Sequence, residues 1–183
     1  MTTKRISFAL VAAALMFILI AGLNSHSSVR AGGESAPQLE GSWVDEVTFV
    51  SGLNAGTTIK SLSTYSRGGG LVTLPVGGVP PPLRSSDGHG TWIHLGERGR
   101  EREEGGGRAF TATIVSFVNN PAGQIVATVK TRQDLTVSAG GDEYNGNSSF
   151  DVFDPAGNLI PGFSGCATVH GRRINVEPPN ACP

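Results

Sequence analysis

Residues 108–137 read RAFTATIVSFVNNPAGQIVATVKTRQDLTV and contain two long runs in which apolar side chains alternate with polar or small ones. Alternation with a period of two is the pattern of a β-strand that buries one face. The intervening NNPAG at 119–123 consists largely of residues that tolerate the dihedral angles of tight turns. The stretch therefore predicts two long antiparallel strands joined by a hairpin.

Period-two segments rich in Val, Ile, Thr and Phe recur along the rest of the chain, which has 26 glycines and 11 prolines. Helical periodicity is nearly absent after residue 31, and the turn sequences AGGD (139–142) and DPAGN (154–158) indicate further hairpins. We predict an all-β fold, an eight-stranded antiparallel up-and-down barrel, because closure removes exposed strand edges. A two-sheet sandwich is the alternative. The predicted strands are Ser42–Val50, Thr57–Tyr65, Gly70–Val76, His89–Leu95, Arg108–Val118, Gln124–Val137, Glu143–Phe153 and Phe163–Val176.

The predicted strand at 124–137 has one polar face and one mostly apolar face, which is expected to point into the barrel. The middle of the inward face carries small or polar residues, namely Ala127, Thr131 and Gln133. A fully packed barrel favours larger residues there, so these positions leave room for a cavity. Ala127, Thr131 and Gln133 are therefore candidate ligand-binding residues.

His89 lies between two glycines and follows a Pro- and Gly-rich segment, 75–88, which we predict to be a loop over one mouth of the barrel. Flanking glycines favour a tight strand start, where the imidazole bonds to nearby backbone. Asp87 is close in sequence, so a role for His89 in a binding site is the second interpretation. His89 is kept as a candidate ligand contact.

His94 has the same strand phase as Trp92, so the two side chains share one face of the predicted strand. The neighbouring Ile93 and Leu95 are the more apolar pair, which favours Trp92 and His94 pointing outward. If Trp92 points inward instead, His94 lines the cavity, and it too is a candidate ligand contact.

No catalytic residue can be assigned from the sequence, because no Ser–His–Asp or Cys–His motif is recognisable. The clustered acidic residues at 101–104 belong to a charged loop, 96–107. We do not expect a catalytic acid–base pair there, because such a pair needs buried surroundings that shift its pKa values. His170 has the outward strand phase, which argues against a haem ligand. We predict no metal site and no cofactor.

The first 31 residues are typical of a secretory signal peptide. Lys4 and Arg5 precede an apolar run at 6–23, a polar segment follows, and Val29 and Ala31 fit the small-residue rule for cleavage after Ala31. An uncleaved membrane anchor is the alternative, since the run approaches the length needed to span a bilayer. We predict a secreted or periplasmic protein with a signal peptide at 1–31, a linker at 32–40, a barrel at 41–176 and a C-terminal tail at 177–183.

The charge of the chain argues against two classes of partner. Its net charge is −1, and removal of Lys4, Arg5 and Arg30 with the signal peptide lowers it to −4. A mildly acidic domain without a basic stripe is not expected to bind nucleic acid. An anionic membrane surface is disfavoured for the same reason, and a membrane partner is expected only if the N-terminal segment stays uncleaved.

Two short motifs at the ends of the predicted barrel resemble a known signature. GSW (41–43) opens the first strand, and GRRI (171–174) lies near the end of the last. A Gly-x-Trp with a late arginine resembles the calycin signature of lipocalin-like barrels, in which the arginine packs on the indole and closes the barrel floor. Strand phase selects Arg173, because Arg172 falls on the other face. GHGTW (88–92), FTATIVSF (110–117) and VFDPAGN (152–158) are also similar to bacterial lipocalin-like proteins, and this resemblance implies no particular activity.

These observations predict an exported lipocalin-like barrel that binds a small, largely apolar molecule in its interior. Two alternatives stay open. One is an enzyme of the cyclase or isomerase type acting on a small organic substrate inside the barrel, and the other is a structural envelope protein with a packed interior. The volume and lining of the interior distinguish them.

Cys166 and Cys182 are the only cysteines of the chain. In an oxidising compartment such a pair usually bonds, and the bond would hold the C-terminal tail against the last strand. A loop of this length corresponds to roughly 3 kcal/mol of stabilisation. We expect thiol counting on the exported protein, denatured without reductant, to find no free thiol. Two free thiols per chain would exclude the bond.

Overall fold

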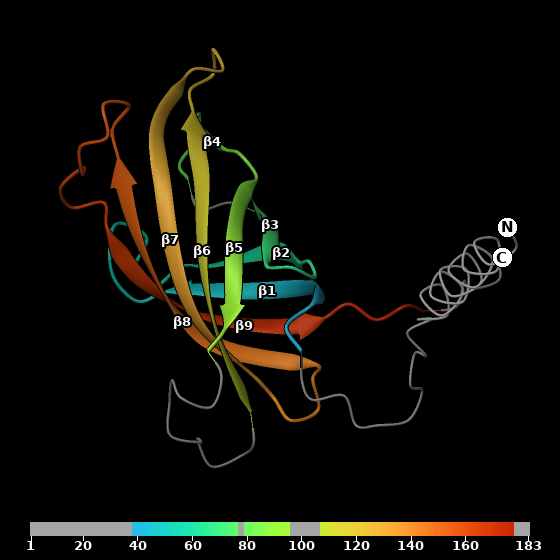
Figure 1. Cartoon of the computed structure of the whole chain (residues 1–183). Coiled ribbons are helices and arrows are strands. Elements are labelled where there is room, and N and C mark those ends of the chain that lie inside the picture. The colour runs from blue at the N-terminus through green and yellow to red at the C-terminus, as the bar shows by residue number, and fades with distance from the viewer. Residues whose placement is uncertain (1–37, 77–78, 96–106, 178–183) are drawn as a thin grey trace, which may run out of the picture. The chain divides into compact units, whose positions relative to one another are not determined.

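The computed structural model describes residues 38–76, 79–95 and 107–177, which form nine β-strands (Figure 1). No helix occurs in these three segments, and none there could span a membrane. The strands are β1 Gly41–Phe49, β2 Thr58–Tyr65, β3 Gly70–Val76, β4 Arg84–Ser85, β5 Gly88–His94, β6 Arg108–Asn119, β7 Ile125–Val137, β8 Glu143–Phe153 and β9 Gly165–Arg173.

Eight of these strands close into an antiparallel barrel. Each pairs with the next along the chain, with β3 passing directly to β5, and β1 closes the barrel by pairing with β9. Figure 1 shows β1 and β9 side by side, although they are the first and last strands of the fold. The up-and-down barrel is therefore confirmed, and the sandwich alternative is wrong.

The loop predicted at 75–88 contains one additional strand. The two-residue β4 pairs with the end of β6, whereas β5 pairs with the earlier part of the same side of β6. Between these two pairings, Ser86 N donates a hydrogen bond to Phe117 O at 2.8 Å. The predicted last strand was too long at both ends. It starts at Gly165, because residues 160–163 form a turn in which Gly162 has a φ of +80°, and it ends at Arg173 rather than at Val176. The other predicted strands match within one residue at each end.

One end of the barrel is closed by large buried side chains, which we call the floor. Trp43 and Tyr144 meet edge to face with ring centroids 4.8 Å apart, and Trp92 packs similarly on Phe110 at 5.7 Å. Such contacts add to the stabilisation from burial of the rings. The largest fully buried members of the floor are Leu39, Trp43, Tyr65, Leu135, Val137 and Tyr144.

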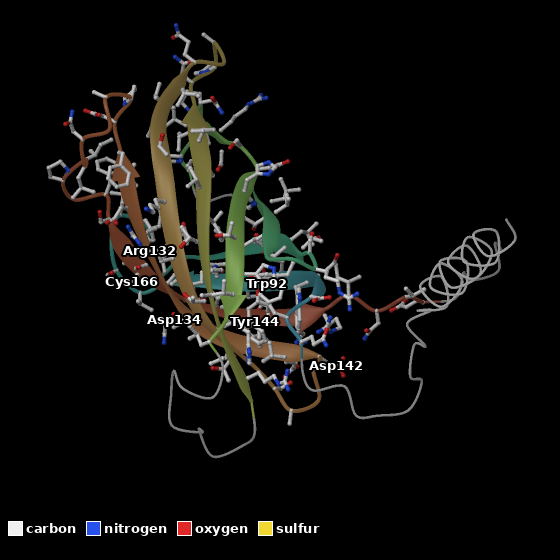
Figure 2. All side chains as sticks on the ribbon, in the orientation of Figure 1. Trp92, Arg132, Asp134, Asp142, Tyr144 and Cys166 are labelled. Carbon is white, nitrogen blue, oxygen red and sulfur yellow. The ribbon has the colours of Figure 1, made fainter. Side chains whose placement is uncertain are left out.

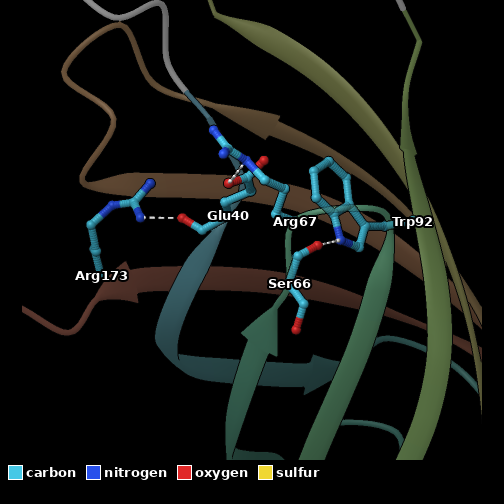
Figure 3. A network of polar contacts seen from close by, with 5 residues as sticks. All are labelled: Glu40, Ser66, Arg67, Trp92 and Arg173. Carbon is cyan, nitrogen blue, oxygen red and sulfur yellow. Dashed lines mark hydrogen bonds and ion pairs between the residues drawn. The ribbon is translucent and has the colours of Figure 1, made fainter. Parts of the chain in front are cut away.

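The floor is centred on the predicted contact between Arg173 and Trp43. The two residues are register partners in the β1–β9 pair, and Arg173 Cζ lies 4.3 Å from the centroid of the Trp43 ring. The guanidinium also donates to the carbonyl oxygens of Gly141 (2.8 Å), Glu40 (2.5 Å, Figure 3) and Gln38 (2.6 Å). Arg173 thus joins three chain segments at one end of the barrel.

Gly41 has to be glycine for two reasons. Its φ of +126° lies in a region that other residues rarely adopt, and a Cβ there would overlap Nη1 of Arg173. The first strand therefore begins with glycine because the arginine of the last strand occupies the space of its side chain. The buried Leu39 just before it accepts a hydrogen bond from Trp43 Nε1 at 2.9 Å, so the predicted linker already contributes to the floor at its end.

Several predictions fall on other parts of the chain. The signal peptide at 1–31, most of the charged loop and Cys182 lie outside the described residues. Cys166 is exposed on β9 and unpaired within the described segments, so the disulfide stays a prediction.

The floor provides a stability test. We expect Trp43→Ala to lower the free energy of unfolding by about 3–5 kcal/mol, the range for large core truncations. Arg173→Ala should cost about 1–2 kcal/mol through the lost cation–π contact, and the two changes should couple in a double-mutant cycle. The exposed Arg172, 3.5 Å from Glu143, provides the control, and Arg172→Ala should cost little. Independent effects of Trp43→Ala and Arg173→Ala in urea denaturation would contradict the account.

Candidate functional site

A cavity of about 390 Å³ occupies the barrel above the floor, toward the end where β1 finishes and β9 begins. Its wall consists of inward-facing side chains of the strands. Residues from the connections complete it, and these are Leu53, Asn54, Val79, Pro80, Leu83, Ile160 and Phe163. The segment 75–88 therefore does contribute to this end of the barrel, as predicted.

The side wall of the cavity is mostly apolar. Phe49 and Phe150 meet edge to face with centroids 5.5 Å apart, and valines and isoleucines from β1, β2, β6, β7 and β8 surround them. A surface of this kind favours an apolar ligand, because binding removes apolar area of both partners from water. The main apolar strand residues of the wall are Val47, Phe49, Ile59, Ile114, Val118, Val129, Phe150 and Val152.

The base of the cavity is polar and contains a buried carboxyl group. Asp45 follows Trp43 by two residues in β1, so it faces inward one step above the floor. It is 3% exposed. Its Oδ1 accepts a hydrogen bond from the Tyr144 hydroxyl at 2.6 Å, and its Oδ2 accepts one from the Ser63 hydroxyl at 2.5 Å.

Further hydroxyl groups extend this polar base. Thr73 Oγ1 lies 2.8 Å from Ser61 Oγ and 3.2 Å from Ser63 Oγ, which links β3 to β2. Ser148 lies next to Gln133 in the β8–β7 register, and both line the cavity. The base therefore presents hydroxyl and amide groups around one carboxyl group.

Tyr144 reaches Asp45 only because the residue between them is glycine. Gly171 pairs with Asp45 on one side and with Tyr144 on the other. A Cβ at Gly171 would overlap the Tyr144 ring, so the ring lies across the glycine and brings its hydroxyl to the carboxylate. Figure 2 shows Tyr144 inside the barrel, in the same region as Trp92.

Burial raises the pKa of Asp45 above its ordinary value of 3.8, and the hydrogen bonds from Ser63 and Tyr144 offset part of this rise. Burial also raises the pKa of Tyr144, as do the nearby Tyr65 and Asp45, so its hydroxyl stays protonated as a donor. In the described part of the chain, Asp45 forms no ion pair. A carboxyl group in this setting can exchange a proton or pair with a cationic group of a ligand.

The structure places three of the five candidate ligand residues in the cavity wall, namely Ala127, Thr131 and Gln133. His89 is exposed on the outer face of β5, because its neighbours Gly88 and Gly90 take the inward positions. A Cβ at Gly88 would overlap Ile114 and Thr73, so the cavity wall itself needs this glycine.

The expected outward direction of Trp92 is wrong. Trp92 packs on the buried cluster of the floor, and its Nε1 donates to the carbonyl oxygens of Ser66 (3.2 Å, Figure 3) and Gly70 (3.1 Å). His94 shares this inward phase, but it lies at the floor end beside Phe110, is exposed, and does not line the cavity. The apolar character of Ile93 misled the interpretation, since Ile93 is 61% exposed.

Asp45 is the main residue that the sequence analysis missed. Its signal was present in the strand phase, because Asp45 shares one face of the first strand with Trp43, Val47 and Phe49. An acidic residue in an inward phase is unusual enough to mark a site. His170, by contrast, lies outside the cavity, with its Nε2 4.0 Å from Glu143 Oε2. Within residues 38–76, 79–95 and 107–177, no group of three metal-ligating side chains is close enough to hold an ion.

Comparison with known proteins gives no further assignment, since no protein-family model, no curated protein and no solved structure matches the chain.

Asp45→Asn tests the buried carboxyl group through its effect on stability. Because folding raises the pKa of Asp45, the folded state favours the protonated form. The associated stabilisation is complete below pH 3.8 and is lost as the pH rises through the folded-state pKa. The unfolding free energy of Asp45→Asn should therefore rise relative to that of the wild type as the pH is raised above 3.8.

Urea denaturation at a series of pH values measures this difference. Glu46→Gln is the matched control, since Glu46 is the next residue of β1 and is exposed on the outer face. We expect no comparable trend for it. A difference between Asp45→Asn and wild type that is flat or falls with pH would show that burial does not govern the protonation of Asp45.

Proposed function

We propose that the barrel binds a small, largely apolar molecule in the cavity above its floor. The observation that carries the proposal is an interior space of about 390 Å³ with an apolar side wall and a compact polar base. Ligand sites typically measure about 300–1,000 Å³ and combine apolar walls with a few placed polar groups. A barrel filled by its own side chains would have no such space, so the cavity argues against a purely structural role.

The proposal includes membership of the calycin superfamily and export from the cell. Support for the first is the closed eight-stranded barrel together with the stacking of Arg173 on Trp43 across the β1–β9 closure. Support for the second is the sequence of residues 1–31 and the presence of two cysteines, Cys166 and Cys182. A signal peptide and a secreted or periplasmic location are thus part of the proposed function, with membrane anchoring by the N-terminal segment as the alternative.

Asp45 also favours a second candidate, an enzyme of the cyclase or isomerase type. A buried carboxyl group with a raised pKa is suited to general acid or base chemistry. However, Asp45 is the single ionisable residue among the described residues of the cavity wall. Mass spectrometry of the small molecules recovered from the wild type and from Asp45→Asn separates the binding protein from the enzyme. An enzyme converts its ligand only when Asp45 is present, so the two samples should then contain different molecules, whereas a binding protein should yield the same molecule from both.

A fluorescent ligand tests binding in the cavity. N-phenyl-1-naphthylamine is a neutral apolar fluorophore whose emission rises in apolar surroundings, so we expect saturable binding to the wild type. Ala127 is buried on the inward face of β7, and Ala127→Phe should place a ring in the cavity and raise the Kd at least tenfold. Thr128→Phe adds the same ring on the outward face and serves as the control.

The two variants decide between binding sites. Equal affinity of the fluorophore for Ala127→Phe and for the wild type, with both proteins folded, would place the binding site outside the cavity and contradict the proposal.

A further inference from the structure

The polar base of the cavity has unused capacity to accept hydrogen bonds. A carboxylate has about four acceptor positions, and Asp45 uses two of them, for Ser63 and Tyr144. The side-chain oxygen of Gln133 is buried and has no hydrogen-bond partner within the described segments. An unpaired buried acceptor lowers stability, and a ligand that donates to it removes this penalty. The base is therefore suited to a ligand group that donates hydrogen bonds.

The charge of the cavity restricts this ligand group further. Among the described residues that line it, Asp45 is the one ionisable residue, and no lysine, arginine or histidine occurs. A carboxylate or phosphate group of a ligand would approach the carboxylate of Asp45 without a cationic partner. A protonated amine would instead place a positive charge where the protein has an unpaired buried negative one.

The described residues around Asp45 contribute no competing charge. The groups that contact it are the Ser63 hydroxyl from β2 and the Tyr144 hydroxyl from β8, while Gly171 of β9 contributes no side chain. Tyr65 is the other titratable group of this region, and burial raises its pKa above the ordinary tyrosine value. At neutral pH both tyrosines are therefore neutral, and the charge of the base is set by Asp45.

From these contacts we infer that the ligand of the cavity is an amine-bearing amphiphile, whose protonated amino group pairs with Asp45 while its apolar part lies along the cavity wall. This inference rests on the proposed function and specifies the chemical class of the ligand. The Tyr144 and Ser63 hydroxyl groups hold the carboxylate in place, and Gln133 supplies a further acceptor. The apolar part contacts the side chains around Phe49 and Phe150.

Three ligands with the same ten-carbon chain test the inference by isothermal titration calorimetry at pH 7, below their aggregation concentrations. Decylamine carries the positive group, decan-1-ol a neutral donor, and decanoate a negative group. We expect decylamine to bind at least tenfold more tightly than decan-1-ol, and decanoate to bind most weakly. Asp45→Asn should lower the affinity for decylamine at least tenfold and change that for decan-1-ol less than threefold. The outward-facing Glu46→Gln makes the same charge change and should alter neither affinity.

The outcomes separate this inference from the proposed function. Equal affinities for the three ligands, a preference for decanoate, or unchanged decylamine binding by folded Asp45→Asn would overturn the amine assignment and leave apolar binding intact. Absence of binding by all three would overturn both.

The wild type provides a second test in case Asp45→Asn does not fold. Its affinity for decylamine should increase as the pH is raised above 3.8, because Asp45 becomes ionised while the amine stays protonated, whereas its affinity for decan-1-ol should not increase. A pH-independent affinity for decylamine would also overturn the inference.

Discussion

The stacking of Arg173 on Trp43 is the interaction on which the rest of the structure depends. It joins the last strand to the first, and it is possible only because Gly41 leaves the space that the guanidinium fills. The same guanidinium holds the carbonyl oxygens of Gln38, Glu40 and Gly141. One side chain therefore takes part both in the closure of the barrel by β1 and β9 and in the closure of its floor.

The packed floor determines the chemistry of the cavity above it. The aromatic rings at this end separate the base of the cavity from solvent at the floor end, so Asp45 is buried on the floor side and open only toward the apolar cavity. Burial raises its pKa, and no cationic side chain of the described residues pairs with it, so its charge is available to a ligand. Gly171 connects the two regions, since it lets Tyr144 belong to the floor and also donate to Asp45.

Most of the fold could be predicted from the sequence, because the strands with one buried face alternate regularly and turn residues separate them. The choice of Arg173 over Arg172 followed from the same alternation. The orientation of Trp92 could not be obtained in this way, because the outer face of the barrel also carries apolar side chains such as Ile93, Leu62 and Leu74. Small residues in the inward phase of β7 indicated the cavity, whereas its polar base depends on contacts between strands distant in sequence. Asp45 and Tyr144 are 99 residues apart, and no local pattern brings them together.

The central claim is that a packed floor supports a hollow, ligand-accessible upper half. Two-dimensional NMR spectra recorded during a titration with decan-1-ol test it most directly, because each amide signal reports on its own surroundings. The account predicts saturable shifts for residues of the cavity wall, such as Val47, Ile59 and Val129, and little change at Leu39 and Val137 in the floor. Shifts confined to the outer face, around Leu62 and Leu74, would contradict it.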